Sequence, residues 1–302
     1  MKNIYFNNYS TTNLGFGCSL LTRNNSIKDA ILNLEVAYDN GIRHFDIARV
    51  YGFGEAETIL GKFAKTKRDQ ITITSKTGLR GRRLPLWSLP FINTIRRSVQ
   101  SNTNASITNR VTGLTAKGIF SPKLIEKDLH ASLKKLNCEY IDFYLLHEAT
   151  ISQANNEDIV AALNLYKNIG KIRAYGIASS SNSIKNEYEN LHKSYEVLQH
   201  SDQAFGNNIL LMPINNELRL RIIYNIFSRL EEIKQLINES KINNNINPIQ
   251  YILSYYKKYN KNGITLFAST NNSHIKNTVQ LWNTIEQAQF DEFNRISNNL
   301  IN

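Results

Sequence analysis

The sequence predicts an α/β fold, a closed parallel eight-stranded (β/α)8 barrel of the TIM type. Short strand-like runs alternate with longer helical patterns along nearly the whole chain, and this order produces a parallel sheet covered by helices. Eight β/α units in 302 residues match the size and strand number of such a barrel. We therefore expect a single barrel domain over residues 1–302, with an open doubly wound sheet as the alternative fold.

Eight apolar runs, rich in β-branched and aromatic residues, have the length of strands. In chain order they are Leu14–Cys18, Arg43–Ile47, Ile71–Ser75, Tyr140–Leu146, Ile172–Ala178, Tyr195–Gln199, Leu220–Ile226 and Gly263–Ala268. Their number is the main reason for preferring a closed barrel.

Amphipathic stretches separate these runs. Apolar residues from Ile27 to Tyr38 recur at i, i+3 and i+4, and Gly41 follows as a helix stop. A second helix is expected over 121–137, with Ser121 as N-cap and Pro122 at the first helical position. The remaining predicted helices are Asn156–Asn168, Ser183–Ser194, Ser228–Glu239, Pro248–Tyr259 and an extra C-terminal helix outside the barrel, Trp282–Ile301.

Composition excludes several classes of protein. No run approaches the roughly 20 apolar residues of a membrane span, and the first residues lack the apolar core of a secretory signal, so we expect a cytoplasmic protein. Cys18 and Cys138 are the only cysteines and lie far apart in sequence. This pattern favours two core thiols over a disulfide framework or a clustered metal site.

The segment from Leu79 to Phe120 breaks the alternation. It has no sustained periodicity, and its seven Lys and Arg residues, without any Asp or Glu, supply most of the net charge of +11. We expect an insertion loop at 79–120 over the barrel mouth, whose arginines bind an anionic group on the substrate or cofactor. The alternatives are a solvated basic loop and a segment that rests on a membrane surface or partner protein. Nucleic acid is not expected as a partner, because aromatic residues are not interleaved with the charges.

Four polar residues follow the second, third and fourth predicted strands, where the active site of a (β/α)8 barrel is built. They are Asp46, Tyr51, Lys76 and His147. An ammonium from Lys76 would lower the pKa of the Tyr51 phenol, and Asp46 would orient the ammonium. His147 would donate a hydrogen bond to a substrate oxygen. Together they would protonate a carbonyl oxygen as a hydride reaches its carbon.

Three stretches that contain these residues resemble the signatures of the aldo-keto reductase superfamily. They are GIRHFDIARVYGFGEAETILG, ITITSKTG and LIEKDLHASLKKLNCEYIDFYLLHEA. All four residues match the family's catalytic tetrad. The resemblance implies reversible reduction of an aldehyde or ketone, or oxidation of the corresponding alcohol or sugar. It also implies a nicotinamide cofactor, usually NADPH, bound without a Rossmann fold.

The same resemblance implies cofactor contacts in the second half of the chain. Gln199 matches the glutamine that reaches the carboxamide, and Tyr224 matches the aromatic residue that stacks on the nicotinamide ring. The family's Ser-Asn pair that holds the same carboxamide appears here as Ala178 and Ser179, of which Ser179 can still make one hydrogen bond. The segment FASTNNSHIKNTV resembles the one that grips the adenosine 2′-phosphate, and offers Ser269, Thr270, His274 and Lys276. The resemblance implies NADP(H) as the cofactor. NAD(H) is the alternative, because Ala268 and His274 stand where family members often carry the Lys or Arg that pairs with the 2′-phosphate.

The same residues bear on other functions. Gly52 and Gly54 do not form a phosphate-binding G-x-G-x-x-G motif, because Glu57 occupies its third glycine position. We expect these two glycines to turn the loop. No metal is expected, since of the six histidines only His147 is well placed at a strand end. A non-catalytic, cofactor-sensing regulatory protein on the same fold remains the alternative function.

Overall fold

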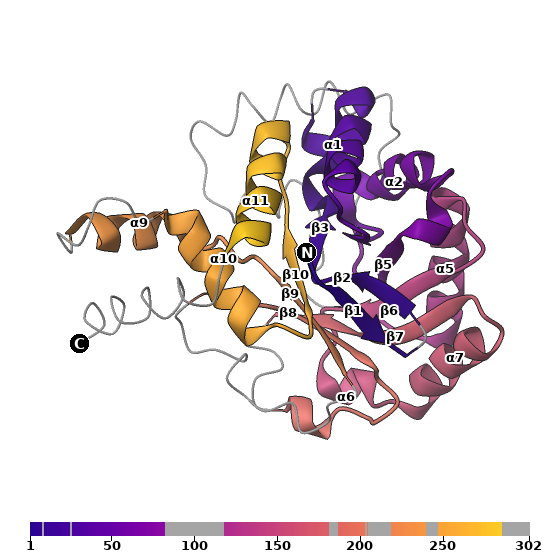
Figure 1. Ribbon diagram of the computed structural model, residues 1–302. Coiled ribbons are helices and arrows are strands. Elements are labelled where there is room, and N and C mark those ends of the chain that lie inside the picture. Colours follow the sequence, from indigo (N-terminus) through magenta and orange to yellow (C-terminus); the bar gives the residue numbers. More distant parts are fainter. Residues whose placement is uncertain are drawn as a thin grey trace.

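The barrel is closed and parallel in the computed structural model, which describes residues 1–302 except 8, 25, 82–117, 181–186, 203, 205–218, 240–246 and 286–302. Its strand order is β10-β3-β4-β5-β6-β7-β8-β9 (Figure 1). The strands are β3 (Leu14–Gly17), β4 (His44–Asp46), β5 (Thr72–Thr77), β6 (Ile141–His147), β7 (Ile172–Ser179), β8 (Val197–Ser201), β9 (Leu220–Tyr224) and β10 (Ile264–Phe267). The predicted (β/α)8 barrel and its eight strands are confirmed.

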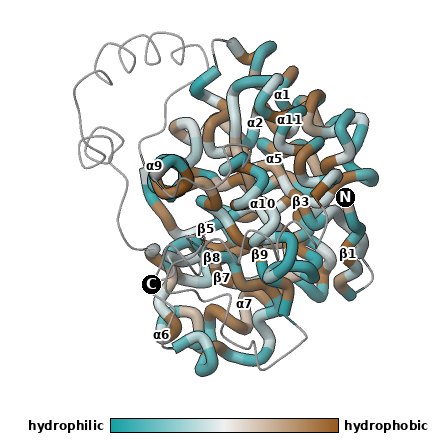
Figure 2. The backbone as a smooth tube through the Cα atoms, turned by 60° about the vertical axis from the view of Figure 1, so that its left-hand side comes forward, coloured by the Kyte–Doolittle hydropathy of each residue, from teal (hydrophilic) through white to brown (hydrophobic). Residues whose placement is uncertain are grey.

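Helices lie outside the strands (Figure 1). The longer ones are α1 (Ile27–Asp39), α2 (Ala56–Ala64), α5 (Pro122–Leu136), α7 (Glu157–Asn168), α9 (Leu230–Glu239), α10 (Pro248–Tyr259) and α11 (Asn272–Thr284). The shorter ones are α6 (Ile151–Ala154) and the 3-10 turns η1 (Cys18–Arg23), η2 (Tyr51–Gly54), η3 (Arg68–Gln70) and η5 (Tyr188–Asn190). Figure 2 shows hydrophilic and hydrophobic colour changing along the helical turns, as amphipathic helices require.

The predicted helix boundaries at α1 and α5 are confirmed by their caps. The Ser26 side chain accepts a hydrogen bond from the backbone N–H of Asp29, and Gly41 has φ 97° just after α1. The Ser121 side chain accepts from the N–H of Leu124, with Pro122 beginning the helix. Each cap satisfies a backbone donor that the first helical turn leaves unpaired.

Two apolar layers hold the barrel together. One fills the barrel interior and includes Phe143 and Leu145, and the other, much larger, lies between strands and helices. An unpredicted antiparallel hairpin, β1 (Asn3–Phe6) with β2 (Tyr9–Thr12), contributes Ile4 to the interior layer. Burial of such a side chain stabilises the fold by about 1.5–3 kcal/mol. Because β2 leads directly into the start of β3, the hairpin lies at the amino ends of the strands.

Two predicted helices differ from the structure. The described part of Ser183–Ser194 contains only the 3-10 turn η5, and residues 181–186 lie outside the described residues. The Asn155 side chain donates to the carbonyl of Asn190 and accepts from the N–H of His192. These contacts take up backbone groups that a continuous helix would pair.

The first three residues of the helix expected over Trp282–Ile301 belong instead to α11, which begins at Asn272, where the Asn271 side chain caps it, and ends at Thr284. Trp282 is buried near the end of α11, and its indole N–H donates to Oδ1 of Asn13 at 3.2 Å. Residues 286–302 lie outside the described residues, so the predicted final helix is not tested. In the described part of the chain, no helix combines the length and apolar character needed to cross a membrane.

Candidate active site

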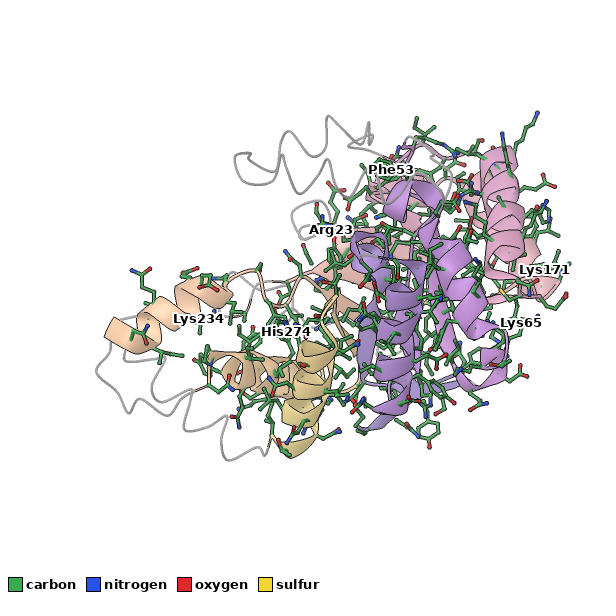
Figure 3. All side chains as sticks on the ribbon, turned by 90° about the horizontal axis from the view of Figure 1, so that it is seen from above. Arg23, Phe53, Lys65, Lys171, Lys234 and His274 are labelled. Atoms are coloured by element: carbon green, nitrogen blue, oxygen red, sulfur yellow. The ribbon has the colours of Figure 1, made fainter. Side chains whose placement is uncertain are left out.

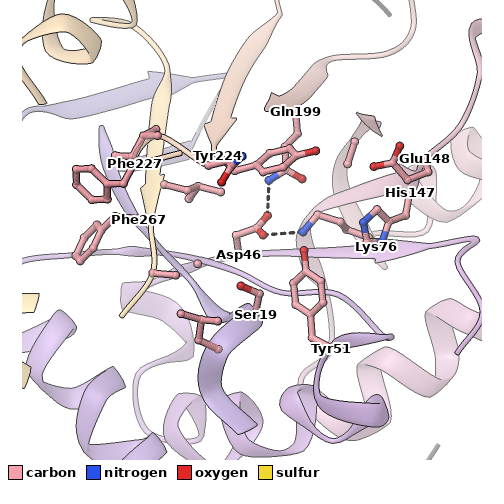
Figure 4. Close-up of a pocket in the computed structure, with 17 residues that line it drawn as sticks. Ser19, Asp46, Tyr51, Lys76, His147, Glu148, Gln199, Tyr224, Phe227 and Phe267 are labelled. Carbon is pink, nitrogen blue, oxygen red and sulfur yellow. Dashed lines mark hydrogen bonds and ion pairs between the residues drawn. The ribbon is translucent and has the colours of Figure 1, made fainter. Parts of the chain in front are cut away.

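A cavity of about 480 Å³ opens at the carboxyl ends of the barrel strands (Figure 4). This is the end at which (β/α)8 barrels build their active sites. All four residues predicted from the strand ends line it, together with two of the predicted cofactor residues. They are Asp46, Tyr51, Lys76, His147, Gln199 and Tyr224.

A buried ion pair forms the floor of the cavity. Lys76 Nζ donates to Oδ1 of Asp46 at 2.6 Å and to the carbonyl of Ile47 at 2.9 Å. Lys76 is 3% exposed and Asp46 is 4% exposed. Two charges this deeply buried are tolerated because each compensates the other and both accept or donate further hydrogen bonds. The pair therefore fixes the position of the Lys76 ammonium.

Tyr51 is carried by the tight turn η2 that follows β4. Gly52 and Gly54 have φ 59° and 89°, in the left-handed region that favours glycine. A Cβ atom at Gly52 would lie 2.1 Å from the side chain of Thr22. Lys135 on α5 donates to the carbonyl of Gly54 and holds the turn from outside. The predicted role of these glycines in turning the loop is confirmed.

The turn brings the Tyr51 ring against two other predicted residues. Lys76 Nζ lies 5.1 Å from the centre of the Tyr51 ring, and the ring centroids of Tyr51 and His147 are 6.1 Å apart in an edge-to-face arrangement. His147 ends β6, two strands away from Asp46 on β4. The structure therefore gathers the tetrad from three successive strands and one turn.

Burial controls the protonation of the Tyr51 phenol and the His147 imidazole. Burial raises the pKa of the Tyr51 phenol well above its usual value, and the negative charge of Asp46 adds to the effect. This net direction is opposite to the lowering expected from Lys76, because burial is the largest cause and Asp46 compensates the ammonium charge at 2.6 Å. Burial, with the Lys76 charge as a second cause, lowers the pKa of His147 well below its usual value. At neutral pH both groups are neutral, and each can donate a hydrogen bond.

Gln199 connects this cluster to the rest of the cavity. Its Nε2 donates to Oδ2 of Asp46 at 2.7 Å, which fixes the orientation of the amide. Its Oε1 is buried and has no hydrogen-bond partner among the described residues. An unpaired buried acceptor costs about 1–3 kcal/mol, so a ligand N–H at this point would be stabilising. Tyr224, at the end of β9, places its ring in the same cavity wall.

Ser179 is not brought to the cavity. It lies at the end of β7, is fully buried, and its Oγ donates to the carbonyl of Ala149 at 2.7 Å. The preceding residue, Ala178, lines the cavity instead. The Ser179 hydroxyl, which was expected to bind a carboxamide, therefore donates its hydrogen bond within the protein.

The predicted phosphate-binding residues gather at the amino end of α11, close along the chain to the cavity residue Ala268. Ser269 and Thr270 precede the helix, and His274 and Lys276 lie in its first turns and are exposed. Figure 3 places His274 at this end of α11. A helix amino terminus with an exposed lysine nearby favours an anion.

The cavity also contains residues that the sequence patterns did not single out. They are Ser19, Glu148, Phe227 and Phe267, among others. In Figure 4 the two phenylalanines lie on the side of the cavity opposite His147 and Glu148. Glu148 directly follows His147 in the sequence, and this adjacency was the one available signal for it.

Most of the basic segment between Leu79 and Phe120 lies outside the described residues, which exclude 82–117. Arg80 is described, and its Nη1 lies 3.1 Å from Oδ1 of Asp128 on α5. The same carboxylate, 1% exposed, also pairs with Arg49 at 2.9 Å. Arg80 thus neutralises a buried carboxylate and does not line the cavity. The predicted substrate and membrane roles of the other arginines are not tested.

Comparison with known proteins agrees with this geometry. A model of the Aldo/keto reductase family matches residues 13–201. The chain is 28% identical over 205 residues to the NADH-specific methylglyoxal reductase of Escherichia coli (strain K12), which covers 65% of this chain and 55% of that protein. It is 31% identical over 156 residues to the aldo-keto reductase YhdN of Bacillus subtilis (strain 168), which covers 51% of this chain and 38% of that protein. The chain thus spans about half the length of the curated relatives it matches, or less.

Solved structures share the fold. The holo form of an aldo-keto reductase from Bacillus halodurans aligns with a TM-score of 0.72 at 20% identity, covering 98% of this chain and 96% of that one. An aldo-keto reductase from Klebsiella pneumoniae in complex with NADPH aligns with a TM-score of 0.61 at 15% identity, covering 98% and 94%. Both similarities extend well beyond the segment that the family model matches.

Proposed function

Because the chain belongs to the aldo/keto reductase family, we propose that it is an NAD(P)H-dependent oxidoreductase. It would reduce an aldehyde or ketone, or oxidise the corresponding alcohol or sugar, in the cavity at the barrel mouth. The observation that carries the proposal is the convergence of four residues in that cavity. These residues are Asp46, Tyr51, Lys76 and His147.

Each of the four has a chemical role in this proposal. A bound nicotinamide cofactor supplies the hydride. The neutral Tyr51 phenol donates its proton to the carbonyl oxygen, and His147 donates a hydrogen bond that orients the same oxygen. Lys76, whose Nζ lies 5.1 Å from the centre of the tyrosine ring, stabilises the phenolate that forms. Asp46 holds Lys76 in place.

The cofactor proposal depends on a different group of residues. Gln199 Oε1 is a buried acceptor without a partner among the described residues, and it suits the N–H of a carboxamide. Tyr224 would stack on the nicotinamide ring. Ser269, Thr270, His274 and Lys276 would contact a phosphate at the amino end of α11. We propose NADP(H) as the cofactor, with NAD(H) as the alternative, since the Escherichia coli relative is named as NADH-specific.

For residues 79–120 we propose a loop over the mouth of a single barrel domain that binds an anionic group of the substrate. The alternative is contact with a membrane surface. Flotation with anionic liposomes, with and without this segment, separates the two. Co-sedimentation that is lost on deletion, while turnover is retained, would contradict the substrate role.

The function is tested by titrating protein fluorescence with NADPH and NADH, followed by a panel of aldehydes, ketones and sugars. We expect saturable binding of at least one cofactor and carbonyl-dependent oxidation of it. Binding of neither cofactor would refute the proposal. Binding without turnover of any substrate would favour the cofactor-sensing regulatory alternative.

A further inference from the structure

Glu148 lines the cavity although strand alternation alone would direct it elsewhere. Along β6, Phe143 and Leu145 belong to the layer inside the barrel, whereas Tyr144 and Leu146 belong to the layer between strands and helices. Side chains on a strand alternate between its two faces. The residue after His147 is therefore expected on the outer side, yet Glu148 lies in the cavity wall.

A local change of backbone conformation accounts for this position. Glu148 has φ 55°, in the left-handed region that residues other than glycine rarely adopt. Two backbone hydrogen bonds hold it there. Its N–H donates to the carbonyl of Ala178 at 2.7 Å, and its carbonyl accepts from the N–H of Gly118 at 3.1 Å. The direction of the side chain is thus fixed by the fold.

The Glu148 carboxylate has no cationic partner in the part of the chain that the structure describes. Oε2 accepts a hydrogen bond from the backbone N–H of Ser180 at 3.2 Å. The ammonium of Lys76, which lines the same cavity, already pairs with Asp46 at 2.6 Å. Because the Lys76–Asp46 pair carries no net charge, the Glu148 carboxylate makes the described wall of the cavity negative.

Glu148 also lies close to the residues that would handle the substrate. Its negative charge contributes to the raised pKa of both the Tyr51 and the Tyr224 phenols. In Figure 4 it lies beside His147, across the cavity from Phe227 and Phe267. A substrate whose carbonyl oxygen contacts Tyr51 and His147 therefore presents its neighbouring atoms to Glu148.

We propose that Glu148 determines substrate specificity, by accepting a hydrogen bond from a hydroxyl group next to the reacting carbonyl and by repelling anionic substrates. The inference rests on the proposed oxidoreductase function. A hydrogen bond to an ionised acceptor is stronger than one between neutral groups. Like charges in a partly buried cavity repel each other more than they do in water.

The test compares Glu148→Gln with the wild-type protein on three aldehydes: glyceraldehyde, propanal and succinic semialdehyde. We expect the ratio of kcat/KM for glyceraldehyde over propanal to fall roughly tenfold in the variant. The ratio for succinic semialdehyde over propanal should rise by about the same factor. Glu139→Gln is the matched control, since the Glu139 side chain is 93% exposed, and it should change neither ratio.

A pH profile separates this role from a structural one. Burial raises the pKa of the Glu148 carboxyl, so the glyceraldehyde preference of the wild-type protein should increase with pH as this group loses its proton. In Glu148→Gln the preference should not depend on pH. Glu148→Asp, which keeps the charge, should keep the discrimination against succinic semialdehyde.

The possible failures are distinguishable. Equal ratios in Glu148→Gln and wild type, with turnover intact, would overturn the Glu148 assignment and leave the oxidoreductase function standing. If the protein binds cofactor without turning over any aldehyde, the dissociation constants of glycerol and 1-propanol for the cofactor complex are compared instead. A ratio of these two constants that is equal in Glu148→Gln and wild type would also overturn the Glu148 assignment. Absence of both cofactor binding and turnover would overturn both proposals.

Discussion

The barrel mouth has two halves that are built differently. The half proposed as catalytic, here the catalytic half, comprises Asp46, Tyr51, Lys76 and His147, and its charged groups are already paired, with Lys76 bonded to Asp46 at 2.6 Å. The half proposed to bind the cofactor, here the cofactor half, comprises Gln199, Tyr224 and the residues from Ser269 to Lys276. There, Gln199 Oε1 lacks a partner among the described residues, and His274 and Lys276 are exposed.

This difference has an energetic consequence. Groups in the catalytic half stabilise one another before any ligand binds, so a substitution there affects the fold as well as the chemistry. Exposed groups in the cofactor half contribute little to stability, and a substitution there should affect ligand binding alone.

The largest effect is expected at the buried ion pair. Lys76→Met leaves the Asp46 carboxylate uncompensated and should lower the free energy of unfolding by about 3–5 kcal/mol, as well as abolishing turnover. Urea denaturation measures the first effect. The double variant Asp46→Asn/Lys76→Met should recover most of the stability without recovering activity. A single variant as stable as the wild type would show that the catalytic half is not preorganised by this pair.

Two buried histidines on barrel strands, His44 on β4 and His200 on β8, make stability depend on pH. Burial lowers the pKa of His44 to about 3 and that of His200 to about 4, from an ordinary value of 6.5. Below pH 6.5 the unfolded chain binds protons at these histidines that the folded chain does not bind. The free energy of unfolding is therefore unaffected by the histidines above pH 6.5 and declines as the pH falls towards 4.

Replacing His200 with Gln should reduce the pH dependence of the unfolding free energy by about 1.4 kcal/mol per pH unit in this range. Urea denaturation at several pH values measures the slope. His44→Gln provides the comparison on β4, where Thr72 and Thr74 contact both ring nitrogens of His44. An unchanged slope in both variants would mean that other groups dominate acid unfolding.

Gln199 lies at the junction of the two halves and should give an intermediate effect. Gln199→Ala removes the proposed carboxamide acceptor, so the dissociation constants of NADPH and NADH should both rise about tenfold. Fluorescence titration measures both. If the two constants stay at the wild-type values, Gln199 does not contact the cofactor.

The smallest effect is expected on the surface of α11. Lys276→Ala should raise the dissociation constant of NADPH several-fold, by roughly 1 kcal/mol or less, and leave that of NADH unchanged. Lys234→Ala on α9, with a side chain 43% exposed, is the control and should change neither. Equal weakening of both cofactors would contradict a role in 2′-phosphate binding.

The catalytic half could be predicted from the sequence because strands of a parallel barrel are continuous apolar runs whose carboxyl ends meet in space. Asp46, Lys76 and His147 were each found by reading to the end of such a run. The hairpin β1–β2 was missed because short polar strands such as Tyr9–Thr12 have no comparable signal.

The direction of a side chain beyond a strand end is harder to predict. Glu148 reaches the cavity through a positive φ, and the Ser179 hydroxyl turns away to the Ala149 carbonyl. Both outcomes depend on backbone torsions that no sequence pattern records. The raised pKa of Tyr51 was likewise missed, because it depends on how deeply the assembled fold buries the phenol.

In the proposed mechanism the catalytic half performs the proton transfer, whereas the cofactor half only binds the cofactor. Tyr51→Phe, assayed for both NADPH affinity and carbonyl reduction, tests it most directly. We expect an unchanged dissociation constant for NADPH and a fall in turnover of about 10²- to 10⁴-fold, the usual contribution of a general acid. Full carbonyl reductase activity in this variant would contradict the account.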